Sequence, residues 1–285
     1  MIDTHCHIQF KAFDVDREEV LLRCREKGVI MNAVATQTNT SKKAVDMASQ
    51  HDDVYATIGL HPIHLFPTRV DEEEDSFISR HEIFDEAYYE TLMHEKVIAI
   101  GETGIDLYHL PSGIEKNIVL QKQRDVFLAQ ASFAKKHDRP LVIHCRDAHE
   151  EMIETMESSI LFSKNNAIVA GVIHCFSGGK KEAMLYTNFG FFLGIGGTLT
   201  YAPKKTNPQV QINLLEAVSW CPLEYIVVET DAPYLAPQAY RGTRNEPWMI
   251  EEVIAKIAEI KNLSFEDVEK QIEKNTKKLF PRIQI

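Results

Sequence analysis

The chain has 285 residues, 44% of them hydrophobic, which suffices for one large domain or two small ones with a substantial core. Its formal net charge of −11 argues against a broad basic face for duplex DNA, and no apolar run approaches the ~18 residues of a membrane span. The start, Met1–Ile8, does not resemble a signal peptide, and five cysteines without CxxC spacing favour free thiols in a reducing, cytoplasmic setting.

Short apolar segments alternate with longer amphipathic segments along the whole chain. The short segments are rich in Val, Ile and Ala and nearly continuous, which is typical of strands buried on both faces. Strands are predicted at Met1–Ile8, Val29–Gln37, Tyr55–His61, Val97–Ile105, Pro140–Cys145, Ile168–Phe176, Phe191–Gly196 and Tyr225–Thr230.

Helical periodicity is found between these segments and after the last of them. Ser264, with Asp267 three residues later, is typical of the cap of a final helix. Helices are predicted at Val15–Lys27, Lys42–Gln50, Val119–His137, Met152–Ser158, Ile212–Trp220, Trp248–Lys261 and Phe265–Leu279.

About eight β–α units in one alternation indicate an α/β protein with a parallel sheet, and at this length a closed (β/α)8 TIM barrel over residues 1–285 is the leading architecture. An open doubly wound sheet is the alternative, but its Gly-rich turn after the first strand is replaced here by histidines. Residues 66–95 exceed an ordinary connection, so we interpret them as an insertion consisting of a loop and then a helix. Its acidic run, Asp71–Asp75, is expected to be a solvated face.

Reactive side chains fall at the carboxyl ends of the predicted strands. In a barrel these ends form one rim, where the active sites of this fold lie. The residues expected to meet there are His5, His7, His61, Glu102, His144, His174 and Asp231.

Strand alternation sorts the residues of the first segment, DTHCHI. Residues i and i+2 share a face, so His5 and His7 point together into the barrel mouth and Cys6 points outward. The same reasoning makes Cys145 and Cys175 small buried residues between sheet and helices rather than metal ligands.

Several histidines with a Glu and an Asp suit divalent Zn, Mn or Mg. The set exceeds the needs of one tetrahedral ion, so two ions sharing a carboxylate is the simplest arrangement, and such sites recur in phosphoester hydrolases. Glu229 and Asp106 lie one step from better placed positions and are interpreted as supporting or salt-bridge groups.

The loops after the strands that carry these residues contain many cations, which would contact a nucleic-acid backbone without reading its sequence. For aromatic residues near the same rim two roles stay open: stacking the bases of a single strand, or packing in the core and loops. The Asn245–Glu246–Pro247 segment is expected to fix the loop geometry, and the alternative is that Glu246 holds an arginine. The remaining histidines outside the rim are expected to be solvated, and His51 to end a helix. The cations are Arg146, Lys180, Lys181, Lys204, Lys205, Arg241 and Arg244. The aromatic residues are Tyr201, Tyr234, Tyr240 and Trp248. The histidines expected to be solvated are His64, His81, His94, His109, His137 and His149.

Seven motifs, in order, resemble the TatD family of metal-dependent deoxyribonucleases within the amidohydrolase superfamily. They are DTHCH, GLHP, GETGID, VIHCR, VIHCF, ETDAPYL and RGTRNEP, and they run from residue 3 to residue 247. The resemblance implies a (β/α)8 barrel with two divalent metal ions that hydrolyses DNA, with 3′-to-5′ exonuclease activity in some members. The expected partner is therefore single-stranded DNA or a 3′ end, and no obligate protein partner is indicated.

The resemblance also implies roles for the rim residues. His5, His7 and Asp231 would hold one metal, His144 and His174 the second, and Glu102 would bridge the two. His61 would contact a substrate phosphate, and Asp231 would position the attacking water and accept its proton. Two other functions stay open: the same barrel could hydrolyse a small cyclic amide, lactone or aminoacyl ester, or it could be an inactive binding scaffold.

Overall fold

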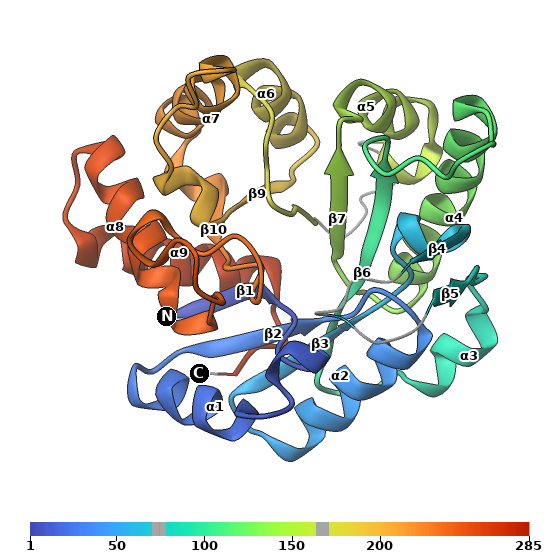
Figure 1. Cartoon of the computed structure of the whole chain (residues 1–285), viewed down its shortest axis with the longest axis horizontal. Helices are drawn as coiled ribbons and strands as arrows, with labels where there is room; N and C mark the ends of the chain where they lie inside the picture. Colours follow the sequence, from blue (N-terminus) through green and yellow to red (C-terminus); the bar gives the residue numbers. More distant parts are fainter. Residues whose placement is uncertain (70–73, 75–77, 164–170, 285) are drawn as a thin grey trace.

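A computed structural model describes residues 1–69, 74, 78–163 and 171–284 (Figure 1). In this part of the chain, eight parallel strands form one sheet in the order β1-β2-β3-β6-β7-β8-β9-β10. The strands are β1 (Ile2–Cys6), β2 (Ile30–Val34), β3 (Val54–Ile58), β6 (Val97–Asp106), β7 (Leu141–Arg146), β8 (Val172–Ile173), β9 (Phe192–Ile195) and β10 (Ile226–Val228).

The sheet closes on itself between its first and last strands. Cys6, the last residue of β1, forms a parallel bridge with Ala232, which lies beyond the end of β10, and the His7 amide donates to the Ala232 carbonyl at 2.7 Å. The Asp231 amide donates to the His5 carbonyl at 2.9 Å. The predicted (β/α)8 barrel is confirmed, and the open doubly wound alternative is wrong.

The helices surround the barrel, as Figure 1 shows. The hydroxyl of Ser264 accepts from the Asp267 amide at 3.1 Å, so the predicted cap of the last helix is confirmed. Among the described residues, no helix has the length and apolar character that a bilayer crossing requires. The helices are α1 (Arg17–Glu26), α2 (Thr38–Gln50), α3 (Glu86–Thr91), α4 (Lys116–Lys136), α5 (His149–Ser158), α6 (Lys180–Asn188), α7 (Pro208–Trp220), α8 (Ile250–Lys261) and α9 (Phe265–Leu279).

Two apolar clusters stabilise the barrel. The larger cluster fills the layer between the sheet and the helices. The smaller cluster lies inside the barrel, where Ile2, Val142 and Phe192, near the starts of their strands, meet Phe280 from the segment after α9. The amino-terminal end of the barrel is thus filled by apolar side chains, and polar residues are concentrated at the carboxyl ends of the strands.

Strand β1 departs from regular pairing with β2. Ile2 packs inside the barrel, and simple alternation from Ile2 would place Cys6 inside as well. The register shifts between Asp3 and Cys6, and Cys6 joins the outer cluster instead. This irregularity reverses the alternation, so that His5 and His7 face the barrel mouth.

The insertion differs from its prediction in two ways. The predicted loop contains a hairpin of β4 (Pro67–Arg69) and β5 (Ile78–Arg80), whereas the predicted helix is present as α3. Residues 71–73 and 75 of the acidic run lie outside the described residues. Glu74, however, is only 4% exposed, so a solvated face is wrong for this residue. Its carboxylate accepts from the Thr36 hydroxyl and from the side-chain NH₂ group of Gln37, which compensates its burial.

Candidate metal centre

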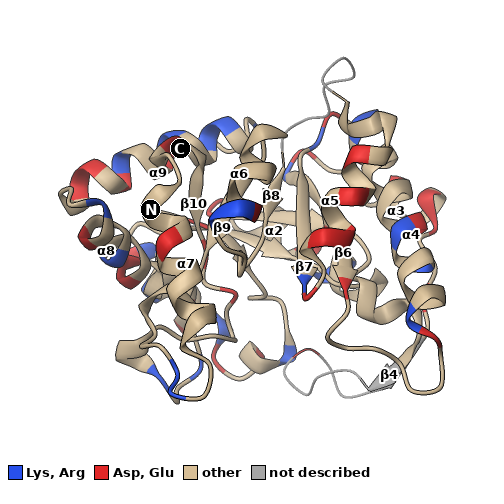
Figure 2. Cartoon of the chain, turned by 90° about the horizontal axis from the view of Figure 1, so that it is seen from above, with Lys and Arg blue, Asp and Glu red and all other residues tan. Residues whose placement is uncertain are grey.

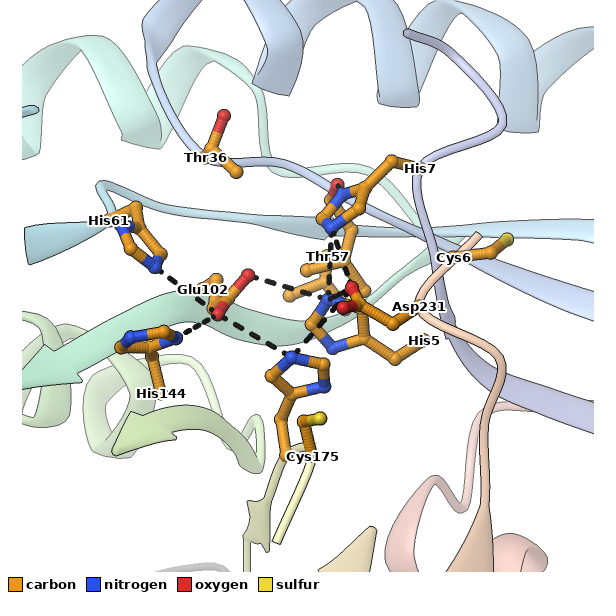
Figure 3. Close-up of polar contacts among 12 residues, drawn as sticks. His5, Cys6, His7, Thr36, Thr57, His61, Glu102, His144, Cys175 and Asp231 are labelled. Carbon is orange, nitrogen blue, oxygen red and sulfur yellow. Dashed lines mark hydrogen bonds and ion pairs between the residues drawn. The ribbon is translucent and has the colours of Figure 1, made fainter. Parts of the chain in front are cut away.

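The seven predicted rim residues converge at the mouth of the barrel, and Figure 3 shows most of their side chains pointing toward Glu102 and Asp231. They come from six different strands or from the segments that follow them. All are buried or nearly buried, so together they form a closed polar cluster. The cluster consists of His5, His7, His61, Glu102, His144, His174 and Asp231.

A first group of ligand atoms lies where β1 meets the segment after β10. The Nε2 atoms of His5 and His7 are 3.4 Å apart. His7 Nε2 lies 3.3 Å from Asp231 Oδ1, and His5 Nε2 lies 3.4 Å from Glu102 Oε2. His5, His7 and Glu102 offer ligand atoms within 4.8 Å of one another, and so do His5, His174 and Asp231, so each of these sets is able to share one cation.

A second group surrounds the other oxygen of Glu102. Glu102 Oε1 lies 2.8 Å from His144 Nδ1, 3.4 Å from His61 Nε2 and 3.8 Å from His174 Nε2. The two carboxylate oxygens of Glu102 therefore face two different sets of imidazoles. This is the arrangement that a bridging carboxylate requires.

Three histidines have a hydrogen-bond acceptor beside the ring nitrogen that faces away from the centre. His7 Nδ1 contacts the Val34 carbonyl at 2.7 Å, and His144 Nε2 contacts Asp106 Oδ2 at 2.9 Å. His174 Nδ1 lies 2.8 Å from Glu229, without the alignment of a full hydrogen bond. Because these acceptors hold the proton on the outer nitrogen, the inner nitrogen keeps its lone pair for a cation.

His61 has the opposite arrangement. The backbone N–H of Ile63 donates to His61 Nδ1 at 3.2 Å, so this nitrogen carries a lone pair rather than a proton. The proton of the neutral ring then lies on Nε2, which faces Glu102. Burial, together with the nearby His144, lowers the pKa of His61 to about 4, so the ring is neutral at pH 7. His61 is therefore a hydrogen-bond donor toward the centre.

The cluster balances buried negative charge with protons on imidazoles. Burial opposes the charged form of His144, but its hydrogen bonds to Asp106 and Glu102 raise its pKa to about 9. Burial likewise opposes charge on His174, but Glu229 and Glu102 raise its pKa to about 10. Cations bound here would replace these protons, because a metal-binding imidazole must be deprotonated. The donor set thus fits divalent metal ions.

Asp3, for which the sequence predicted no role, supports the cluster through hydrogen bonds to two segments that carry its residues. Its carboxylate is fully buried and accepts from the Thr230 amide at 3.0 Å, from the Thr230 hydroxyl and from the His5 amide at 3.2 Å. It therefore connects the histidine segment of β1 to the residue preceding Asp231. Asp231 itself has a φ of +58°, a strained conformation that this connection helps to hold.

Residues 2–281 match the family model described as TatD related DNase. The chain belongs to this family. It is 34% identical over 281 residues to the metal-dependent hydrolase YabD of Bacillus subtilis, covering 98% of each chain. It is 30% identical over 288 residues to the 3′-5′ ssDNA/RNA exonuclease TatD of Pantoea ananatis, covering 98% of this chain and 99% of the relative. The crystal structure of the TatD homolog YjjV from Escherichia coli superposes with a TM-score of 0.79 at 26% identity, covering 99% and 98% of the two chains.

The cysteines of this TatD-family hydrolase follow the alternation argument in two cases out of three. Cys6 is fully buried and points away from the cluster (Figure 3), and Cys145 is buried beside His149. The prediction for Cys175 is wrong, because this residue is partly exposed and near a ligand atom of His174. Strand β8 ends at Ile173 and Cys175 has a φ of +43°, so strand alternation no longer applies at this position.

Three of the histidines expected to be solvated are not, and one of them, His137, is partly buried with Nε2 3.0 Å from Glu90. His64 is fully buried, with Nε2 3.4 Å from the buried carboxylate of Glu74. His149 lies in α5 and bonds the Tyr186 hydroxyl at 3.0 Å. His109 is exposed as predicted, yet its Nδ1 also reaches Asp106 at 3.0 Å. His51 caps the end of α2, as predicted.

Not all of the cations predicted at the rim are free of a carboxylate partner and so available to bind a phosphate. Arg146 and Arg241 are exposed and lack a carboxylate partner among the described residues. Arg244 instead forms a bidentate ion pair with Asp16 at 2.8 and 2.6 Å. It also contacts Glu246, the residue considered above as a partner for an arginine. Elsewhere, Figure 2 shows Lys and Arg interleaved with Asp and Glu on outer helices such as α8.

Proposed function

We propose that this TatD-family hydrolase cleaves phosphodiester bonds of DNA, proceeding from the 3′ end toward the 5′ end. The observation that carries the proposal is the pair of imidazole groups on the two oxygens of Glu102, since two-metal sites of this kind recur in phosphoester hydrolases. The Pantoea ananatis relative named as a 3′-5′ ssDNA/RNA exonuclease supports the direction of cleavage and the substrate.

Two divalent cations, Mg²⁺, Mn²⁺ or Zn²⁺, would be held by the residues of the cluster. His5, His7 and Asp231 would hold one ion, His144 and His174 the other, and Glu102 would contact both. The ions would supply Lewis-acid activation of water and of the phosphate. Asp106 and Glu229 would keep the two histidines of the second group in the tautomer that binds a cation.

The side chains of the protein supply positioning and proton transfer. The Asp231 side chain is 14% exposed, compared with 4% for Glu102, so it is the carboxylate better placed to orient a water and accept its proton. His61 would donate a hydrogen bond from its Nε2–H group to a phosphate oxygen, because its Nδ1 accepts from the Ile63 amide. Arg146 and Arg241 would contact flanking phosphates.

The setting of the reaction follows from the thiols. All five cysteines of the chain are free, and four of them are buried. Free thiols fit the reducing conditions of the cytoplasm, where we place this activity.

Digestion of oligonucleotides labelled at the 3′ or the 5′ end, with a panel of divalent ions, tests the proposal. We expect stepwise shortening from the 3′ end with the metal-loaded protein, and loss of most activity in His5→Ala and Asp231→Asn. Lactones, cyclic amides and aminoacyl esters are assayed in parallel. Hydrolysis of these compounds without cleavage of any oligonucleotide would refute the proposal in favour of small-molecule hydrolysis, and wild-type turnover in either variant would refute the assigned site.

A further inference from the structure

Two arginine–tyrosine pairs lie at the carboxyl ends of strands that surround the metal centre. The guanidinium of Arg146, the last residue of β7, lies 4.0 Å from the ring centre of Tyr108, in the segment after β6. The guanidinium of Arg241 lies 4.2 Å from the ring centre of Tyr201. In the order of strands around the barrel, β8 and its His174 separate the first pair from the second.

The pair of Tyr108 and Arg146 is fixed to the metal centre through one carboxylate. Asp106 Oδ1 accepts from the Tyr108 amide at 2.9 Å, while Asp106 Oδ2 contacts His144 at 2.9 Å. Arg146 follows His144 by two residues, so both point to the inner side of the rim. The tyrosine is nevertheless 59% exposed.

An exposed aromatic ring beside an unpaired guanidinium has the chemistry of a nucleotide subsite. When a guanidinium stacks on one face of a tyrosine ring, its N–H groups lie in the plane of the guanidinium, at its edge, and stay available to bind a phosphate. The exposed tyrosine ring is then available to a nucleobase. Several other arginines among the described residues, such as Arg17, Arg23 and Arg244, are paired with carboxylates, which leaves them less able to bind a phosphate.

We propose that Tyr108 and Arg146 form a subsite in which Tyr108 stacks one unpaired base and Arg146 binds the adjacent phosphate, while Arg241, held on Tyr201, binds a phosphate on the other side of the centre. The proposal rests on the proposed nuclease function and deepens it. A base stacked on Tyr108 is unpaired, so the subsite selects single-stranded nucleic acid over a duplex. Stacking does not depend on base identity, so the subsite tolerates all sequences.

The test compares kcat/KM for a single-stranded oligonucleotide with kcat/KM for the small diester bis(p-nitrophenyl) phosphate, using the metal-loaded full chain. Loss of one stacked base corresponds to roughly 5- to 140-fold. We expect Tyr108→Ala to lower the ratio of the two constants by about tenfold and Tyr108→Phe to restore it to within about threefold. Leu110→Ala, an exposed residue of the same loop, is the matched control and should keep the wild-type ratio.

Two results would overturn the subsite. The first is an unchanged ratio in Tyr108→Ala, and the second is an equal loss in Tyr108→Phe, which would assign the effect to the hydroxyl group. Both results require that the wild-type chain cleaves the oligonucleotide, so they leave the proposed function standing. A wild-type chain that cleaves no oligonucleotide contradicts the proposed function itself.

Discussion

Asp106→Asn is the change that best separates a positioned metal ligand from a histidine that is only buried. Asp106 is fully buried, and its two oxygens have different partners. Oδ1 accepts two backbone amides, those of Tyr108 at 2.9 Å and His109 at 2.7 Å. Oδ2 contacts the ring nitrogens of His144 at 2.9 Å and His109 at 3.0 Å.

This division of partners fixes the orientation of an asparagine at position 106. The two backbone amides need an acceptor, so the carbonyl oxygen takes the place of Oδ1 and the NH₂ group takes the place of Oδ2. The NH₂ group then donates to His144 Nε2, which moves the ring proton to Nδ1. Because Nδ1 is the atom that faces Glu102, the neutral ring then carries its proton at the position where a cation requires a lone pair. The loop itself keeps its backbone hydrogen bonds, so we expect the fold to survive.

The size of the effect follows from the bond that is lost. A hydrogen bond to a charged group contributes about 1.5–3 kcal/mol, which is roughly 12- to 140-fold in affinity. Loss of the outer partner of a metal-binding histidine typically weakens metal binding about 10- to 100-fold. We therefore expect Asp106→Asn to weaken one of two metal sites by about 1.4–2.8 kcal/mol and to leave the other nearly unchanged.

Titration of the metal-free protein with Mn²⁺ or Zn²⁺, followed by calorimetry and by metal analysis, measures both sites. His109→Ala is the matched control, because it removes the other partner of Asp106 Oδ2 and leaves the contact of Asp106 with His144 in place. We expect wild-type affinity in that variant. Equal affinity for both ions in Asp106→Asn and in the wild type would refute the tautomer argument.

Three further changes test other parts of the structure. Cys6→Ser places a hydroxyl in the outer core, where the Asn32 carbonyl, 3.5 Å from the thiol, is a weak partner. The free energy of unfolding, measured in urea, should therefore fall by about 1–2 kcal/mol with unchanged metal content. Loss of metal would contradict the outward orientation of this side chain. Although Glu74 is buried, its contacts with His64 and Thr36 lower its pKa from 4.5 to about 2. The ionised form of Glu74 therefore stabilises the fold above pH 4.5, and this stabilisation decreases as the pH falls toward 2. Glu74→Gln should therefore be less stable by up to about 3 kcal/mol at pH 7 and by less at pH 4, and equal urea midpoints at pH 7 would count against this contribution. Removal of metal by EDTA should lower Tm more at pH 9 than at pH 6.5. Protonated His144 and His174, with pKa values raised to about 9 and 10, stabilise the metal-free cluster at low pH, and this stabilisation is lost as the pH rises through these values. An equal decrease in Tm at both pH values would contradict this charge balance.

The sequence was sufficient to predict the barrel and the residues of the cluster because both depend on simple periodicities. In β7, Val142 packs inside the barrel and His144 follows it on the same face, while Ile143 and Cys145 pack against the helices. Regular alternation places a ligand at the end of such a strand without further information. The same reasoning gave His174 after β8.

Positions where the backbone leaves regular geometry could not be predicted in this way. The left-handed φ of Cys175 exposes a side chain that alternation would bury. Glu74 was misjudged for a different reason. An acidic run is usually solvated, but the fold brings Thr36 and Gln37, far away in the sequence, to this one carboxylate.

The metal cluster and the seam that closes the barrel consist of the same contacts. In the described part of the chain, an isolated bridge joins β1 to the segment after β10, whereas other neighbouring strands pair over two or more positions. The seam also includes the backbone hydrogen bonds from the His7 amide to Ala232 and from the Asp231 amide to His5, the binding of Thr230 by Asp3, and His5 and His7 facing Asp231. These ligands come from opposite ends of the chain, so a cation between them would link the first and last strands directly. A bound cation would therefore stabilise the closure of the barrel as well as take part in its chemistry, because an ion that binds only the closed form favours that form.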